Sequence, residues 1–142
     1  MAFSKVLVAF DGSELSTKAL NTALAYCREN QAQLEVLHVV NFQNFVVGEA
    51  MVAFPVPLQK EIQDNAEKLM AKAEAQMEGL PGSRVVLRQG SPAAAILDHA
   101  EENQCDLIII GSRGFGAFRS FMLGSVSNHV VQNSQIPVLV IK

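Results

Sequence analysis

Three short segments of the chain consist almost entirely of valine, leucine, isoleucine and other apolar residues. They are Lys5–Phe10, Asp106–Gly111 and Pro137–Lys142. Strands that are covered on both faces have such near-continuous apolar runs, whereas half-exposed strands alternate apolar and polar residues. Because parallel sheets are the sheets that helices cover on both faces, these runs predict a mostly parallel sheet.

Two further segments, Gln33–Val40 and Arg84–Gln89, are also typical of strands. They carry charged residues, namely Glu35, Arg84 and Arg88. We therefore expect these two strands to be more exposed than the other three.

Helical patterns separate the five predicted strands. Ser13 or Ser16 can cap a first helix that runs to about Asn30, and Ser91 with Pro92 is typical of a helix start. The other two helices are expected over Leu58–Glu78 and from about Ser125 to Asn133. This alternation predicts one α/β domain over residues 1–142, a doubly wound, five-stranded parallel sheet with four helices. The long apolar connection Asn41–Pro57 fits a lid, an interface element or a segment packed on its own helices.

Composition excludes several classes of protein. Hydrophobic residues make up 49% of the chain, and the net charge is -3. That charge gives no bulk attraction to nucleic acid or to acidic membranes. Cys27 and Cys105 lack the spacing of a zinc or redox motif, and no apolar run is long enough to span a membrane. We expect a soluble cytoplasmic protein without nucleic-acid or membrane partners.

Glycines gather after the fourth predicted strand, between Gly111 and Ser125. In an open α/β sheet, ligands bind beyond the carboxyl ends of strands where the strand order reverses. A second polar loop, which begins at Asp11, follows the first strand, so the two loops meet if these strands are neighbours. The loop and the start of the fourth helix then form a plausible phosphate cradle. It consists of the amide groups that begin this helix, the hydroxyls of Ser125 and Ser127, and the charges of Arg113 and Arg119.

Two well-known phosphate-binding motifs do not fit. A P-loop requires a glycine followed by lysine, and none occurs in this chain. The nearest match to the dinucleotide motif begins at Gly114 but ends in Arg119, and it follows the fourth strand instead of the first.

The spacing that does fit is Gly111, two residues, Gly114, nine residues, then Gly124-Ser125. This pattern resembles the nucleotide motif of the universal stress protein family, in its ATP-binding branch. The resemblance covers the whole chain, including "VLVAFDGSE", "LHVV", "CDLIIIGSRG", "LGSVSNHVV" and "PVLVIK". It implies a sheet with strand order 3-2-1-4-5, in which the first and fourth strands lie side by side.

The resemblance also implies roles for individual residues. Asp11 would lie near the ribose or a phosphate-bound Mg²⁺ or Mn²⁺; the alternative is a purely local role in an Asx turn or as an N-cap. The backbone of Val39 would face adenine. The positions expected to line the ribose and phosphate region are Ala9, Ile110, Gly111, Arg113 and Gly114. Those expected to hold phosphates are Gly124, Ser125, Val126 and Ser127.

We interpret the chain as an ATP-binding stress-response or signalling module with at most slow ATP hydrolysis, because no convincing catalytic base is evident. Two alternatives stay open: an ATP-hydrolysing or nucleotidyl-transferring enzyme, and a dimeric interaction protein whose nucleotide site is idle. The resemblance further implies a homodimer through the last strand, where Val138 and Val140 would lie at the contact.

Overall fold

The computed structural model describes residues 2–41, 45–47, 50–52, 55–113 and 123–142. Its strands are β1 (Lys5–Ala9), β2 (Gln33–Val40), β3 (Phe45–Val47), β4 (Ala50–Val52), β5 (Arg84–Gln89), β6 (Leu107–Gly111) and β7 (Val138–Ile141). Its helices are α1 (Glu14–Asn30), α2 (Val56–Gln76), α3 (Pro92–Glu102) and α4 (Ser125–Asn133).

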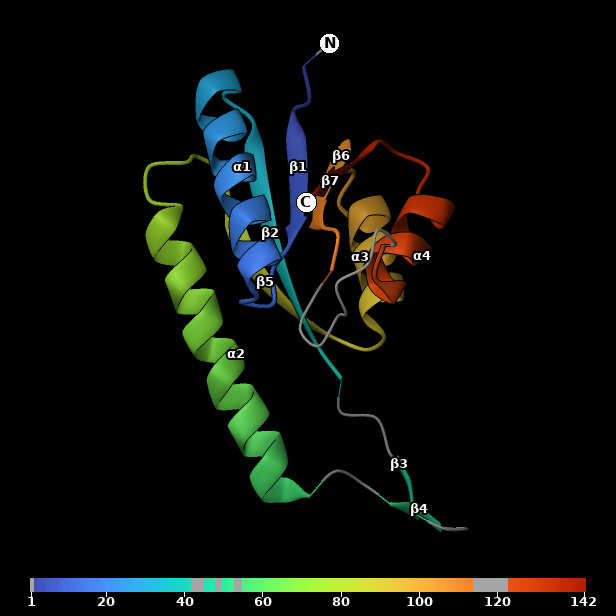
Figure 1. Cartoon of the computed structure of the whole chain (residues 1–142). Coiled ribbons are helices and arrows are strands. Elements are labelled where there is room, and N and C mark those ends of the chain that lie inside the picture. The colour runs from blue at the N-terminus through green and yellow to red at the C-terminus, as the bar shows by residue number, and fades with distance from the viewer. Residues whose placement is uncertain (1, 42–44, 48–49, 53–54, 114–122) are drawn as a thin grey trace.

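The five longer strands form one parallel sheet in the order β5-β2-β1-β6-β7. This confirms the predicted fold, because the order corresponds to 3-2-1-4-5 when the hairpin strands are left out. Figure 1 shows α1 and α2 on one face of the sheet and α3 and α4 on the other. Residues of β1 alternate between the two cores: Val6 and Val8 pack under α1, whereas Leu7 packs under α3. The central strands β1, β2 and β6 are therefore largely buried on both faces, as the apolar runs of β1 and β6 predict. The expectation for the last apolar run is wrong: β7 is half-exposed, as β5 is, because both lie at edges of the sheet.

Local interactions fix where the elements begin. Ser13 is the N-cap of α1, and its side chain accepts a hydrogen bond from the Ser16 amide, which settles the choice between these two serines. Ser91 precedes Pro92 at the start of α3, as predicted. At the start of β1, the carboxylate of Asp106 accepts hydrogen bonds from the amides of Ser4 and Lys5, at 2.8 and 3.0 Å.

The connection between β2 and α2 contains a feature that the sequence did not predict. β3 and β4 pair as an antiparallel two-stranded sheet, separate from the main sheet. Figure 1 shows this hairpin beyond the carboxyl end of β2, projecting away from the main sheet. Strands of three residues are too short to give a periodic pattern, so the sequence contained no clear signal for them.

The expectation that Glu35 marks an exposed strand is wrong. Glu35 is only 1% exposed, and its carboxylate pairs with Arg84 of the neighbouring strand and with His99 of α3. A single charge in an apolar run therefore indicated a buried ion pair here.

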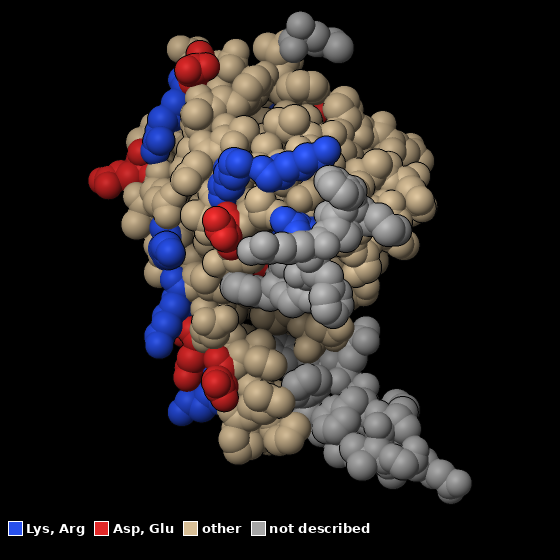
Figure 2. All heavy atoms as spheres, in the orientation of Figure 1, with Lys and Arg blue, Asp and Glu red and all other residues tan. Residues whose placement is uncertain are grey.

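Charges on the surface are mixed. Figure 2 shows basic and acidic side chains alternating along the side of the molecule that α2 forms. Within the described ranges, no helix is long and apolar enough to cross a membrane.

Candidate functional site

Two loops meet at the carboxyl edge of the sheet because β1 and β6 are hydrogen-bonded neighbours. One loop connects β1 to α1, and the other leaves β6 and leads to α4. The strand order reverses at this point, since β2 follows β1 on one side and β6 lies on the other. The topology thus places the candidate site where α/β sheets bind ligands.

The loop after β1 has a fixed conformation. Oδ1 of Asp11 accepts a hydrogen bond from the Ser13 amide at 2.9 Å, so Asp11 does form an Asx turn. Within the described part of the chain, its other carboxylate oxygen has no partner, and it remains able to contact a ligand. Gly12 has φ +84, a left-handed conformation that favours glycine, and Leu69 of α2 packs against it. Sequence reasoning missed Gly12, although the Asp-Gly pair after a strand was a signal for such a turn.

Ser112 connects the end of β6 to the start of α4. Its amide donates to the Ile141 carbonyl of β7 at 2.8 Å. Its carbonyl oxygen accepts two hydrogen bonds, from the Gly124 amide at 2.8 Å and from Oγ of Ser127 at 2.7 Å. Sequence reasoning missed Ser112, and no signal could have found it, because its backbone makes these contacts.

The two described glycines of the motif are both required for close packing. A Cβ at Gly124 would lie 3.3 Å from the Ser112 carbonyl oxygen and 3.4 Å from Cα of Arg113. A Cβ at Gly111 would lie 3.0 Å from Cβ of Leu15, in the first turn of α1. Gly124 has φ -63, which any residue can adopt, so the close contacts and not the backbone conformation favour glycine here. These glycines let two helix starts approach the end of β6.

The first turn of α4 can bind an anion. Gly124 is the N-cap, and its carbonyl accepts from the Asn128 amide. Among the described residues, the amides of Ser125, Val126 and Ser127 have no hydrogen-bond partner, as at any helix start. Ser125 is exposed, whereas Ser127 is only 2% exposed. We call residues Gly124–Ser127 the cradle.

The other residues of the predicted site lie at the same edge or outside the described residues. Ala9 ends β1, Val39 is near the end of β2, and Ile110 is near the end of β6. Ala9, Val39 and Arg113 are half-buried, and Ile110 is buried. Gly114 and Arg119 lie outside the described residues. The ligand contacts expected of this set stay predictions.

A metal ion could bind at this edge only together with a phosphate-bearing ligand. The described ranges contain no group of three or more His, Cys, Asp and Glu residues that could hold a metal ion. The free oxygen of Asp11 could supply one ligand to a Mg²⁺ or Mn²⁺ ion, and phosphate oxygens would have to supply others.

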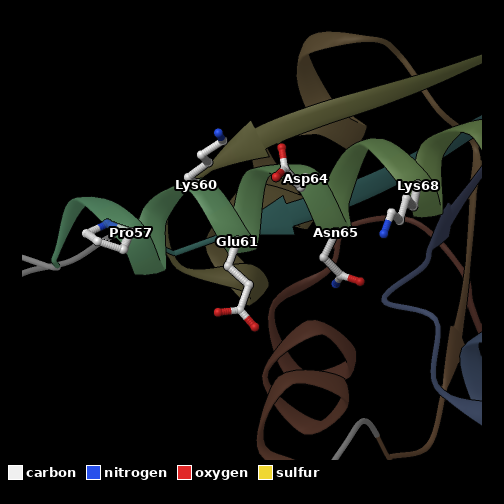
Figure 3. A pocket seen from close by; sticks show the side chains of 6 residues that line it. All are labelled: Pro57, Lys60, Glu61, Asp64, Asn65 and Lys68. Atoms are coloured by element: carbon white, nitrogen blue, oxygen red, sulfur yellow. The ribbon is translucent and has the colours of Figure 1, made fainter.

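A hollow of about 450 Å³ lies along α2 (Figure 3). The described residues that line it are Pro57, Lys60, Glu61, Asp64, Asn65 and Lys68. All of them project from this one helix, at spacings of one face, and their charges are mixed. This hollow resembles a solvated helix face more than a binding site, because the described residues of other elements add no converging polar group.

Comparison with known proteins gives the family. The model of the universal stress protein family matches residues 2–142. The chain belongs to the universal stress protein family. A relative, universal stress protein YxiE of Bacillus subtilis, is 38% identical over 148 residues, which cover 99% of both chains.

Solved structures of universal stress proteins share the fold. UspA from Lactobacillus plantarum has a TM-score of 0.76 at 22% identity, and the match covers 100% of this chain and 99% of that one. A universal stress protein from Archaeoglobus fulgidus in complex with dAMP has a TM-score of 0.69 at 22% identity, with full coverage of both chains. A universal stress protein in complex with cAMP has a TM-score of 0.66 at 24% identity, covering 100% of this chain and 98% of that one. Nucleotides are thus bound by members with this fold.

This universal stress protein also has a buried polar cluster, on the α3 side of the sheet. Glu35 accepts hydrogen bonds from Nε of Arg84 at 2.6 Å and from Nε2 of His99 at 3.1 Å. Nδ1 of His99 lies 3.3 Å from Nη1 of Arg88, which also pairs with Glu102 at 3.0 Å. Arginine can only donate, so Nδ1 accepts, and His99 is a neutral imidazole that carries its proton on Nε2.

The pKa values of this cluster follow from its geometry. Burial alone would raise the pKa of Glu35, but the hydrogen bonds from Arg84 and His99 outweigh it and lower that pKa. Burial lowers the pKa of His99, and the Glu35 carboxylate offsets only part of this effect. Both groups therefore keep their neutral-pH forms in the folded protein. Nothing in the cluster is arranged to bind a ligand, and we assign it to stability.

Acid is expected to destabilise the protein through His99. Since its folded pKa is lowered, the unfolded chain takes up a proton first as pH falls below about 6.5. Above pH 6.5, His99 should thus cause no change of the free energy of unfolding with pH. Between pH 6.5 and 5 that free energy should decrease, as measured by urea denaturation. His99→Gln keeps a donor and an acceptor without titrating, and should flatten the decrease between pH 6.5 and 5. An equal decrease in both proteins would contradict this.

The two cysteines are not reactive centres. Burial raises the pKa of Cys27 to about 11 and that of Cys105 to about 11. Both thiols are buried and stay protonated at neutral pH, so neither is an effective nucleophile.

Proposed function

We propose that this universal stress protein binds ATP at the carboxyl edge of its sheet and acts as a nucleotide-dependent stress-response or signalling module. The observation that carries the proposal is the cradle, in which three amides that have no partner among the described residues begin α4 beside the end of β6. Such amides, together with the helix dipole, favour a phosphate group. The related structures with dAMP and cAMP support a nucleotide as the ligand.

The proposed roles of the site residues follow this geometry. Phosphates would contact the amides of Ser125–Ser127 and the hydroxyl of Ser125, and Asp11 would contact the ribose or a phosphate-bound Mg²⁺ or Mn²⁺. When bound, such an ion would neutralise phosphate charge. We propose at most slow hydrolysis, because His38, near the end of β2, is only 8% exposed with its Nδ1 2.8 Å from the Phe10 carbonyl oxygen, and the Asp11 carboxylate is held in an Asx turn. The proposed location is the cytoplasm.

ATP should raise the melting temperature of the protein more than NAD or FMN does. A ligand that binds only the folded state adds about 2.7 kcal/mol of stability at one hundred times its Kd. Differential scanning fluorimetry with each compound at equal concentration measures the shift. A shift with NAD equal to or larger than that with ATP would contradict the proposal.

Two other functions predict different results. An ATP-hydrolysing or nucleotidyl-transferring enzyme would release phosphate or pyrophosphate at rates that depend on added metal. An interaction protein with an idle site would retain no nucleotide after purification. Mass spectrometry of the small molecules that co-purify with the chain distinguishes the idle site from the rest, and phosphate release with and without metal distinguishes enzyme from module.

We further propose a homodimer that forms through β7, the edge strand of the sheet. The Pro137 carbonyl accepts from the Ile108 amide of β6 at 3.0 Å, and the Ile141 carbonyl accepts from the amide of Ser112, the residue after β6, at 2.8 Å. Because peptide groups alternate along a strand, the amides of Val138 and Val140 face the open edge, whereas that of Leu139 faces β6. The side chain of Leu139 is 43% exposed. An apolar edge of this kind favours pairing with a second copy.

Val140→Pro should convert the dimer to a monomer. The substitution removes an edge-facing amide and leaves the amide hydrogen bonds between β6 and β7 in place. Light scattering at tens of micromolar would report the mass, with circular dichroism to show that the chain is folded. A folded Val140→Pro variant that stays dimeric, or a monomeric wild type, would contradict the proposed interface.

A further inference from the structure

We propose that the hydroxyl group of Ser127 positions the cradle and does not contact phosphate; this inference rests on the proposed nucleotide site. The resemblance implied that this residue holds phosphate. In the structure its hydroxyl group lies 2.7 Å from the Ser112 carbonyl oxygen and 3.1 Å from that of Gly124. A hydroxyl has one proton to donate, and the shorter distance shows that the Ser112 carbonyl receives it.

A side chain that binds a phosphate oxygen has to donate a proton to it, and the Ser127 proton is already donated to the Ser112 carbonyl. Phosphate oxygens accept hydrogen bonds, so Ser127 could contact one through its side chain only by leaving the Ser112 carbonyl. The residue is 2% exposed, and leaving would break a short buried hydrogen bond. Ser125 differs in both respects: it is exposed, and in the described part of the chain its hydroxyl has no partner.

The bond that Ser127 makes holds the cradle against the sheet. Ser112 is itself tied to β7 through Ile141, at 2.8 Å. Its carbonyl binds α4 twice, through the Gly124 amide at the N-cap and through Ser127 in the first turn. Two bonds to one carbonyl restrict the rotation of the helix start about either bond. Ser127 thus fixes the direction in which the amides of Ser125 and Val126 point.

The test compares Ser127→Ala, Ser127→Thr and, as the matched control, Ser125→Ala. Hydrogen exchange of the Gly124 amide, followed by NMR without nucleotide, should become about tenfold faster in Ser127→Ala, because the second bond to Ser112 is lost. Calorimetry should show ATP binding about fivefold weaker, with adenosine binding unchanged within about twofold. Ser127→Thr keeps the hydroxyl and should restore both values. Ser125→Ala should weaken ATP binding without changing the exchange of Gly124.

Each contrary result has a distinct meaning. Unchanged Gly124 exchange in Ser127→Ala, or failure of Ser127→Thr to restore it, overturns the positioning role even where ATP binds. Equal losses for ATP and adenosine overturn it in favour of a general structural role. A wild type that binds no ATP instead overturns the proposed function. If Ser127→Ala does not fold, Ser127→Cys, which keeps the size but donates weakly, takes its place in the same measurements.

Discussion

Gly124→Val is expected to weaken ATP binding by about a hundredfold or more while the chain stays folded. The added Cβ would lie 3.3 Å from the Ser112 carbonyl oxygen and 3.4 Å from Cα of Arg113, both backbone atoms that cannot swing aside. The start of α4 must then move away from the end of β6, and the cradle amides with it. Losing two hydrogen bonds to a charged phosphate, at about 1.5–3 kcal/mol each, corresponds to about two to four decades of affinity.

A graded series separates this mechanism from loss of folding. Gly124→Ala adds the Cβ alone and should bind with intermediate affinity. Ser125→Ala removes one hydroxyl but no amide, and should lose about one to two decades. Calorimetry with ATP and circular dichroism on the same samples give affinity and folding. Binding of ATP by folded Gly124→Val as tightly as by wild type would show that Gly124–Ser127 is not the phosphate site.

The sheet could be predicted from the sequence because its signal is local. Runs such as Val6–Val8 and Leu107–Ile110 are apolar on both faces; the first precedes a helical pattern and the second lies between two. Burial of Val6, Leu7 and Val8 at 0% exposure shows why both faces had to be apolar. The β3–β4 hairpin could not be predicted in the same way, since three residues per strand are too few to establish a period.

The place of the candidate site in the fold could be predicted from the sequence, but its contacts could not. Strand order and glycine spacing placed the cradle beside β6. The sequence could not show that Gly111 makes room for Leu15, because that contact joins residues 96 positions apart. Nor could it show that the carbonyl of Ser112 holds the helix start, since every residue has a carbonyl. Spacing therefore located the residues, whereas their contacts came only from the fold.

Glu35 shows the same limit for charge. Its partners, Arg84 and His99, are 49 and 64 residues away in the sequence. A lone carboxylate in a strand normally indicates solvent, because burying it without a partner is costly. Here the parallel register places Arg84 directly beside Glu35, and α3 brings His99 over both. A charge in an apolar run thus indicates either exposure or a distant partner, and local pattern does not distinguish them.

Arg84→Met is therefore expected to destabilise the protein by about 3 kcal/mol at pH 7.5. The substitution leaves a carboxylate that is 1% exposed with His99 as its remaining partner. Breaking a buried pair costs about 3–5 kcal/mol, and half of the Arg84 side chain is exposed, so the lower end applies. Arg28→Met is the matched control: Arg28 is exposed and donates to a backbone carbonyl, that of Gln76, so it should cost less than about 1 kcal/mol.

The pH dependence of Arg84→Met should also be opposite to that of the wild type. Without the guanidinium, the buried pair of Glu35 and His99 carries an uncompensated negative charge, and the folded state gains affinity for a proton. A folded pKa raised above its unfolded value contributes stability at low pH that is lost as pH rises. The difference in the free energy of unfolding between wild type and Arg84→Met should thus be smaller at pH 5.5 than at pH 7.5, as measured by urea denaturation. A deficit that is constant or grows on acidification would show that Arg84 stabilises the fold by packing and not by compensating the charge of Glu35.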